Sequence, residues 1–289
     1  MSDDTKRSTG YHGGGVETVI SVEEVTRQAA AIAEDITIDK LDALANNEPD
    51  VQINDLVAGY GQMEILHNLN LRVGKAQSLC LIGPNGAGKS TILHAIFGFN
   101  RIFSGQIQIG EGSDMLDVTS LTPNQKLSRA GIAYILQDKS IFPGMTVEEN
   151  LWMGGFLKDR PQEAKQAAEM VFDKYDRLAK RRKHKAGVLS GGERRLLEIS
   201  RALVMNPEVL LVDEPSIGLE PRFIDMVFDI LDDLQNNEGK TIIMVEQNAK
   251  KGLEFADIGY VLVSGQLAIA GKGDDLLKNP KVGELFLGG

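Results

Sequence analysis

Hydrophobic and polar residues alternate in two stretches early in the chain. Residues 51–53 and 69–73 place apolar side chains at every second position, and turn residues separate the two stretches. A period of two is typical of a strand with one buried face. The pattern therefore predicts an antiparallel β-layer here. Near the other end of the chain, the segments 259–263 and 266–270 are joined by a short turn and predict a hairpin.

Runs that are almost entirely apolar predict a second group of strands. They occupy residues 78–82, 131–136, 209–212 and 241–245, and glycine or polar residues follow each of them. Short apolar runs bounded in this way are typical of strands that are buried on both faces. We therefore expect a mostly parallel sheet built from these four runs.

Capping residues predict where several helices begin. Thr146 and Glu149 have the capping-box spacing before an apolar segment. Pro161 is expected at the first position of a long helix that runs to residue 180. A further helix is expected to begin at residues 189–193 and to continue to Leu203.

The first 48 residues differ from the rest of the chain. They begin polar, pass through a glycine-rich stretch, and show helical spacing from Ser21 onwards, with Glu24 completing a capping box. We expect an extension at residues 1–48 that is partly helical or disordered, followed by the main domain at residues 49–289. A docking or regulatory arm is the alternative interpretation of this extension.

The segment after residues 78–82 carries the most informative motif of the chain. It matches G-x-x-x-x-G-K-[ST] between a predicted strand and a predicted helix, which is the context of a phosphate-binding loop. Lys89 would reach the β- and γ-phosphates, and the Ser90 hydroxyl would bind Mg²⁺. An ordinary glycine-rich turn is the alternative, and the flanking elements argue against it. The nucleotide-binding residues expected here are Gly83, Pro84, Asn85, Gly86, Ala87, Gly88, Lys89, Ser90 and Thr91.

Polar residues follow two of the other buried runs. Gln137 comes after residues 131–136, and Asp213 and Glu214 come after residues 209–212. A carboxylate at the end of a strand beside a phosphate loop is placed to hold Mg²⁺ through water, so Asp213 is the expected metal residue. Glu214 is then the expected general base for an attacking water. Solvated acids at a strand end are the alternative.

Two further signals are weaker when taken alone. The glycines in Ser190-Gly191-Gly192-Glu193 leave N–H groups free at a predicted helix N-terminus, where an anion can approach. Tyr60 lies between two glycines and could stack on a nucleotide base, a contact worth about 1–3 kcal/mol. A simple turn is the alternative for Tyr60.

Charge and composition narrow the class of protein. The formal net charge is −10, which argues against a nucleic-acid-binding surface. Cys80 is the one cysteine, so no internal disulfide can form. No stretch reaches the roughly 18 apolar residues that a spanning helix needs, and no secretory signal is expected at the N-terminus. The basic run at residues 180–185 is expected to be the solvated end of a helix.

Taken together, these motifs resemble those of the ABC-type ATP-binding subunits. The resemblance covers residues 51–289 and rests on the order and spacing of the motifs at 83–91, 137, 189–193 and 209–214. The segments at 213–219, 245–249 and 286–289 look like those of ATPase subunits from branched-chain amino acid importers. The resemblance implies an α/β fold with a P-loop NTPase core, an antiparallel β-layer and an inserted helical subdomain at about 138–188.

The resemblance also assigns a role to each site residue. Tyr60 matches the aromatic residue that stacks on adenine, and Lys89, Ser90 and Thr91 match phosphate and metal contacts. Gln137 matches a metal and water ligand that senses the membrane subunit, while Asp213 and Glu214 match the Mg²⁺ carboxylate and the general base. The signature residues that would complete the ATP site of the opposite subunit are Ser190, Gly191, Gly192 and Glu193.

Two positions differ from the general pattern of that family. Gln247 occupies the place of the usual switch histidine, and an amide can hydrogen-bond a γ-phosphate but cannot carry a positive charge. Glutamine here also resembles the importer subfamily, so Gln247 is kept as a catalytic candidate together with Glu214 and Lys89. Glu220 stands where aspartate is usual, which puts coupling across the dimer in question.

The resemblance further implies cofactors and partners. It predicts an ATPase that uses ATP and Mg²⁺ and acts with a second ABC ATPase subunit, with membrane permease subunits and, indirectly, with a solute-binding protein. It places the chain peripherally on the cytoplasmic face of the inner membrane. Phe142, Met145 and Trp152 are candidates for permease docking, with core packing the alternative for Trp152. The alternative functions are a lipid-type exporter and a soluble cofactor-assembly ATPase.

Overall fold

The computed structural model describes residues 36–137 and 140–286. The helix expected from Ser21 onwards lies outside the described residues. The described helices are α2 (Ile38–Leu44), α3 (Lys89–Phe97), α4 (Pro123–Ala130), α5 (Val147–Gly154), α6 (Pro161–Lys174), α7 (Asp176–Ala179), α8 (Gly191–Leu203), α9 (Pro221–Asn236), α10 (Ala249–Phe255), α11 (Gly273–Leu277) and α12 (Pro280–Phe286). The described strands are β1 (Pro49–Tyr60), β2 (Met63–Gly74), β3 (Ser78–Ile82), β4 (Arg101–Ile109), β5 (Leu116–Asp117), β6 (Ile132–Ile135), β7 (Val209–Asp213), β8 (Thr241–Val245), β9 (Ile258–Val263) and β10 (Gln266–Lys272).

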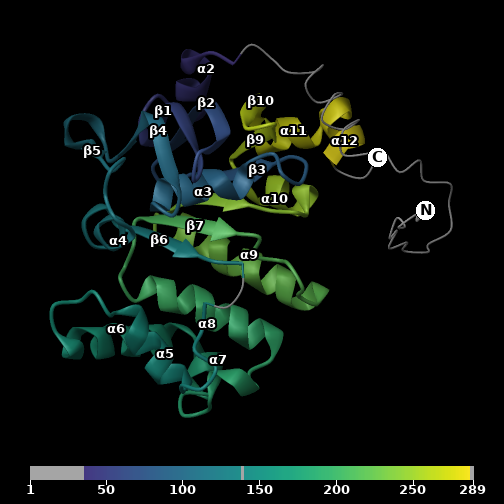
Figure 1. Ribbon diagram of the computed structural model, residues 1–289. Helices are drawn as coiled ribbons and strands as arrows, with labels where there is room; N and C mark the ends of the chain where they lie inside the picture. The colour runs from purple at the N-terminus through teal and green to yellow at the C-terminus, as the bar shows by residue number, and fades with distance from the viewer. Residues whose placement is uncertain (1–35, 138–139, 287–289) are drawn as a thin grey trace, which may run out of the picture.

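The strands form two sheets (Figure 1). The larger sheet has the order β10-β9-β3-β8-β7-β6, and its strands from β9 to β6 are parallel. The smaller sheet is antiparallel, in the order β2-β1-β4-β5. The predicted α/β fold with a mostly parallel core and an antiparallel β-layer is confirmed. The strands β3, β7 and β8 are buried along their whole length, as continuous apolar runs in a covered sheet must be.

Helix α3 lies between the two sheets, and its apolar side chains pack into a core that both sheets share. The residues it contributes are Ile92, Leu93, Ala95 and Ile96. The opposite face of the larger sheet packs against α8, α9 and α10 through a second core. Because side chains are closely packed on both faces of the larger sheet, the sheet cannot shift relative to its helices. The loops at its strand ends are therefore held in fixed positions.

A helical subdomain of α5, α6 and α7 extends below the larger sheet in Figure 1 and has its own apolar core. The capping box of Thr146 and Glu149 opens α5, and Pro161 is the first residue of α6, as predicted. The prediction of a single helix from 161 to 180 is wrong. Helix α6 ends at Lys174 because Tyr175 leaves helical geometry, with φ −120° and ψ 82°, and the half-buried Tyr175 ring packs on the core.

The basic run follows α7 and is mostly solvated, as predicted, with Lys183 76% exposed, but Arg182 is 34% exposed and the run makes ion pairs with other helices. Arg182 and Lys183 both pair with Glu148 of α5, whose side chain is only 7% exposed, and Arg182 also pairs with Glu169 of α6. The pKa of Glu148 is lowered by its hydrogen bonds from these two cations, which outweigh the opposing effect of desolvation. The run therefore ties the turn after α7 to α5 and α6.

The last residues of the N-terminal extension pack on the main domain. Leu41 of α2 is fully buried in the core shared by the sheets. Arg72 of β2, 4% exposed, donates a 2.9 Å hydrogen bond to Asp42 and a 2.7 Å hydrogen bond to the carbonyl of Ile53. The domain division at residue 48 remains a prediction, but α2 covers the β-layer physically. Among the described residues, no helix is long and apolar enough to cross a membrane.

We expect Leu41→Ala to destabilise the protein by about 2–5 kcal/mol, because it opens a cavity in a fully buried position. Ile38→Ala on the same helix is the matched control, since Ile38 is 39% exposed and should cost less than about 1 kcal/mol. Chemical denaturation of the full chain measures both. Equal and small effects would show that α2 does not contribute to the core.

Candidate functional site

The register of the parallel strands brings the predicted site residues to one edge of the sheet. Val245 of β8 is paired with Leu81 of β3 on one side and with Asp213 of β7 on the other. On the far side of β7, Ile135 of β6 is paired with Val212. The phosphate loop and Glu214 come directly after β3 and β7, and Gln247 and Gln137 lie two residues beyond the ends of β8 and β6. Side chains that are up to 164 residues apart in sequence (247 − 83) therefore lie at adjacent strand ends.

The loop after β3 has the backbone that a phosphate cradle needs. Gly83, Gly86 and Gly88 have φ values of 145°, 83° and 99°, which side chains rarely allow. At Gly83 a Cβ atom would also lie 2.2 Å from the carbonyl oxygen of Leu262. The ammonium group of Lys89 donates hydrogen bonds of 2.9 and 3.1 Å to the carbonyls of Gly83 and Pro84. Lys89 thus lies across the loop that it is expected to serve.

Asp213 is held by partners on both carboxylate oxygens. Its Oδ1 accepts a 3.1 Å hydrogen bond from Ser90, and its Oδ2 accepts a 2.8 Å hydrogen bond from the Tyr134 hydroxyl. Asp213 is only 7% exposed. Burial and the nearby Asp213 charge raise the pKa of Tyr134, so its hydroxyl stays protonated and donating. Tyr134 was not identified from the sequence, where it looked like one more apolar residue of a buried run.

The oxygen atoms of Ser90 and Asp213 suit a hard divalent cation. The described residues include no cluster of three or more His, Cys, Asp or Glu side chains able to hold a metal ion. A site with so few protein ligands fits a cation such as Mg²⁺, which takes one or two carboxylates and completes its shell with water and substrate phosphates.

Glu214 occupies a strained position at the end of β7. Its φ is +44°, in the left-handed region, and its N–H donates a 2.8 Å hydrogen bond to the carbonyl of Val245. Its carboxylate accepts a 2.9 Å hydrogen bond from the amide of Gln137. Desolvation, and then the charge of Asp213, raise the pKa of Glu214. A carboxylate with a raised pKa is a better proton acceptor, which is the property of a general base.

Glu246 is a site residue whose role the sequence did not reveal. It is 2% exposed, accepts a 2.7 Å hydrogen bond from Ser216 Oγ, and accepts a 3.0 Å hydrogen bond from the N–H of Asn248. These bonds join the loop after β7 to the loop after β8, so Glu246 positions Glu214 and the exposed Gln247 relative to each other. The sequence did contain one signal for Glu246, which is that its carboxylate comes directly after a buried strand.

Arg195 of α8 was also missed, and no pattern around it could have indicated its role. It is 4% exposed and donates hydrogen bonds to the carbonyls of Leu136, at 2.8 Å, and Asp213, at 3.4 Å. Glu198 accepts a further 3.0 Å bond from it. Arg195 therefore joins the ends of β6 and β7 to α8.

The signature segment is built as a helix N-terminus. Ser190 is the N-cap of α8, and it forms a reciprocal capping box with Glu193, whose carboxylate also pairs with Arg181. The hydrogen bonds from Ser190 and the charge of Arg181 lower the pKa of Glu193. Gly192 is required by packing, since a Cβ atom there would lie 2.1 Å from the ring of Phe223. Glu193 thus stabilises its own helix.

The signature segment and the phosphate loop lead into helices that pack on opposite faces of the larger sheet. Helix α3 packs into the core shared by the two sheets, whereas α8 packs on the other face of the larger sheet. Figure 1 shows them on opposite sides of β6 and β7. No hydrogen bond or ion pair links residues 189–193 to residues 83–91 in the part of the chain that the structure describes.

Tyr60 lies at the end of β1 and is 44% exposed. Its hydroxyl forms a hydrogen bond with Nδ1 of His94 on α3, the helix that begins in the phosphate loop. The structure thus places the predicted base-stacking residue against the same helix that carries Lys89 and Ser90.

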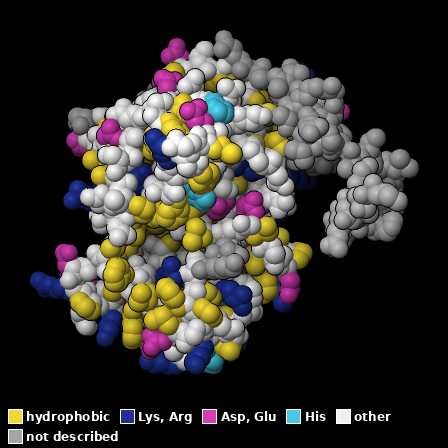
Figure 2. Space-filling view, viewed as in Figure 1, with side chains coloured by type: hydrophobic (Ala, Val, Ile, Leu, Met, Phe, Trp, Pro, Cys, Tyr) yellow, Lys and Arg dark blue, Asp and Glu magenta, His cyan; other side chains and the backbone are white. Residues whose placement is uncertain are grey.

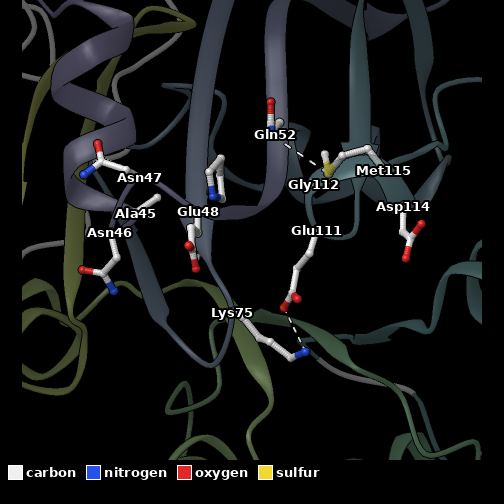
Figure 3. Close-up of a pocket in the computed structure, with 12 residues that line it drawn as sticks. Ala45, Asn46, Asn47, Glu48, Gln52, Lys75, Glu111, Gly112, Asp114 and Met115 are labelled. Carbon is white, nitrogen blue, oxygen red and sulfur yellow. Dashed lines mark hydrogen bonds and ion pairs between the residues drawn. The ribbon is translucent and has the colours of Figure 1, made fainter.

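Two cavities lie near the sheets. One, of about 530 Å³, is lined in part by Gln137, Gly191 and Arg195. Another, of about 720 Å³, lies between the end of α2 and the segment around Glu111 and contains none of the predicted site residues (Figure 3). It borders the end of β1 and β2 opposite to Tyr60, so it is not the nucleotide site.

Comparison with known proteins agrees with this geometry. The family model described as "ABC transporter" matches residues 66–217. The chain is 41% identical over 230 residues to the high-affinity branched-chain amino acid transport ATP-binding protein BraG of Pseudomonas aeruginosa, covering 80% of this chain and 96% of BraG. It is 39% identical over 233 residues to the probable branched-chain amino acid transport ATP-binding protein LivF of Archaeoglobus fulgidus, covering 81% of this chain and 96% of LivF.

A solved structure gives the same assignment. The ADP conformation of an ATP-binding cassette of an ABC transporter has a TM-score of 0.71 and 28% identity, covering 84% of this chain and 99% of that one. The matched region contains the phosphate loop, Gln137, the signature segment and the carboxylates of Asp213 and Glu214 at the end of β7. The chain therefore belongs to the ABC transporter family as an ATP-binding subunit that hydrolyses ATP.

Proposed function

We propose that this chain drives an importer of branched-chain amino acids or related small polar solutes, as one half of a two-subunit ATP sandwich. The observation that carries the proposal is the 41% identity to BraG, with the two chains aligned over nearly the whole of BraG. BraG is named for branched-chain amino acid transport, and in this proposal the permease and a solute-binding protein choose the cargo. The sequence of this subunit therefore indicates a class of solutes, and it does not distinguish one solute of that class from another.

In this proposal Ser90, Asp213 and Gln137 hold Mg²⁺, which neutralises charge on the β- and γ-phosphates when it is bound. Ser90 and Asp213 already lie within 3.1 Å of each other. Lys89 and the N–H groups of the phosphate loop bind the same phosphates, with Thr91 at the start of α3 beside them. Tyr60 stacks on the base.

Glu214 acts as the general base in this proposal. Its raised pKa and its position next to Asp213 support that role. Gln137 donates to the Glu214 carboxylate and so orients it. Gln247, at the end of the neighbouring strand β8, contributes an amide hydrogen bond to the γ-phosphate and no charge.

The need for a second subunit follows from the placement of α3 and α8. The phosphate loop leads into α3 and the signature segment begins α8, and these two helices pack on opposite faces of the larger sheet. In this proposal Ser190, Gly191 and Gly192 complete the ATP site of another subunit. That subunit is a second copy or a related ATPase.

Membrane permease subunits are the other proposed partners, and they would hold the chain at the cytoplasmic face of the inner membrane. Exposed apolar side chains on the helical subdomain support this contact. Phe156 and Met170 are 74% and 72% exposed, and Phe142 is 43% exposed. Figure 2 shows hydrophobic side chains gathered over the lower part of the molecule, where Figure 1 places α5 and α6. Trp152 packs half-buried against the subdomain core, so Phe142 is the better docking candidate.

Uptake by cells that lack this chain tests the proposal. We expect the deletion to reduce the initial uptake rate of radiolabelled leucine, isoleucine or valine, or of a small amide or urea, at least severalfold. Wild-type chain should restore the rate, and Glu214→Gln should not. Normal uptake of all these solutes together with a defect in lipid export would support the exporter. If the deletion changes neither solute uptake nor lipid export and the chain co-purifies with a soluble partner, the cofactor-assembly function would be supported.

Glu214→Gln is expected to lower ATP turnover by about 100- to 10,000-fold, because the amide cannot accept the proton of the attacking water. ATP binding should persist and the variant should accumulate as an ATP-bound dimer, which size-exclusion chromatography detects. Glu254→Gln, on an exposed position of α10, is the control and should retain turnover. Full turnover by Glu214→Gln would rule out its role as the base.

Ser190→Asp is expected to separate nucleotide binding from turnover. Aspartate is as good an N-cap as serine, so α8 should persist, but its charge would repel the γ-phosphate held by the opposite subunit. We expect the ADP affinity of the isolated subunit to stay unchanged while turnover falls by about 100-fold, a loss of the size that oxyanion-contact removal produces.

The control for this variant is Thr146→Asp, which places the same residue in the equivalent capping box of α5. That variant should retain turnover. A parallel loss in both variants, or a loss of ADP affinity in Ser190→Asp, would contradict the assignment of Ser190 to the opposite site.

A further inference from the structure

One titratable residue close to the site has no role in the proposed mechanism. His94 lies one turn beyond Ser90 on α3, on the side that faces β1 and β6. It is half-buried. Burial lowers the pKa of His94, so its imidazole is uncharged at neutral pH and has one nitrogen free to accept a hydrogen bond.

The contact that His94 makes with Tyr60 is direct. The Tyr60 hydroxyl forms a hydrogen bond with Nδ1 of His94, and the two rings meet edge to face at 84°, with centroids 6.0 Å apart. Tyr60 is 44% exposed at the end of a hairpin, where a tyrosine ring without an anchor would occupy several orientations. The bond therefore restricts the ring before any base arrives.

The His94 ring is itself held on two sides. Tyr134 and Phe99 contact it edge to face, each with ring centroids 5.8 Å away. Tyr134 is fixed in turn by its 2.8 Å hydrogen bond to Asp213. A continuous set of contacts thus runs from the carboxylate expected to hold Mg²⁺ to the aromatic ring expected to hold the base.

We propose that His94 is a positioning residue of the nucleotide site, which orients the Tyr60 ring for the base through the Tyr60 hydroxyl. This inference rests on the proposed stacking role of Tyr60. His94 does not touch the phosphates in this arrangement. It acts only on the part of the affinity that the base contributes, by removing the cost of ordering Tyr60 when the nucleotide binds.

Two ligands separate base binding from phosphate binding. ATP has a base, and inorganic tripolyphosphate has none, so calorimetry with each in Mg²⁺ buffer reports the two contributions. We expect His94→Phe, which keeps an aromatic ring but loses the acceptor, to weaken ATP binding about fivefold and to leave tripolyphosphate binding unchanged. A general distortion of α3 would weaken both ligands and would overturn the inference.

The choice of side chain separates hydrogen bonding from packing. His94→Asn places a polar atom near the position of Nδ1 without a ring, and it should restore most of the ATP affinity that His94→Phe loses. If the ring mattered only as packing, the phenylalanine variant would bind ATP better than the asparagine variant. That order would overturn the inference even if one variant were less stable.

Changes at Tyr60 complete the test. Tyr60→Phe should weaken ATP binding as His94→Phe does, and the double variant should lose no more than either single variant, because both remove the same bond. Additive losses would contradict the inference. Tyr60→Ala should weaken ATP binding further. If Tyr60→Ala binds ATP normally, the proposed stacking of Tyr60 on the base is wrong. If Tyr60→Ala binds ATP weakly but His94→Phe binds it normally, the stacking proposal stands and only the role of His94 is wrong.

Discussion

Parallel hydrogen bonding of β3, β8, β7 and β6 in register is the constraint on which the site depends. It aligns Leu81, Val245, Asp213 and, through Val212, Ile135, so that the loops after these strands meet at one edge. The strands β3, β7 and β8 are buried throughout and flanked by cores on both faces. A slip of one residue would turn every side chain to the other core, so the register is strongly specified.

Around that edge, buried polar groups fix one another. Asp213 accepts from Ser90 and Tyr134, Glu246 joins two loops, and Arg195 ties the ends of β6 and β7 to α8. Because each of these groups has partners, the site gains rigidity without the cost of unsatisfied burial. The left-handed backbone of Glu214 costs free energy that the surrounding bonds offset. The residues proposed for chemistry are thus held in place before a nucleotide binds.

The larger sheet separates the two helices that follow the nucleotide motifs, α3 after the phosphate loop and α8 after the signature serine. The helices α3 and α8 cover opposite faces of that sheet, so the phosphate loop and the signature segment of one chain lead into different cores. In the proposed function the signature segment acts on the ATP site of another subunit. The capping box of Ser190 and Glu193 and the contact of Gly192 with Phe223 keep that helix N-terminus rigid for its partner.

The sequence by itself determined the fold class, and it predicted the phosphate loop and the carboxylates at the end of β7, because these depend on local periodicity and on short motifs whose spacing has a direct physical meaning. It also identified Tyr60, Gln137 and Gln247 as candidates. Tertiary structure alone revealed the contacts of Tyr134, Arg195 and His94, since their partners come from other elements and no local pattern distinguishes them from ordinary helix and strand residues. Glu246 had a local signal, but its partner Ser216 lies in another loop. Tertiary structure likewise ended α6 at Lys174 and paired the basic run with Glu148 and Glu169, because packing on a distant helix outweighs local propensity.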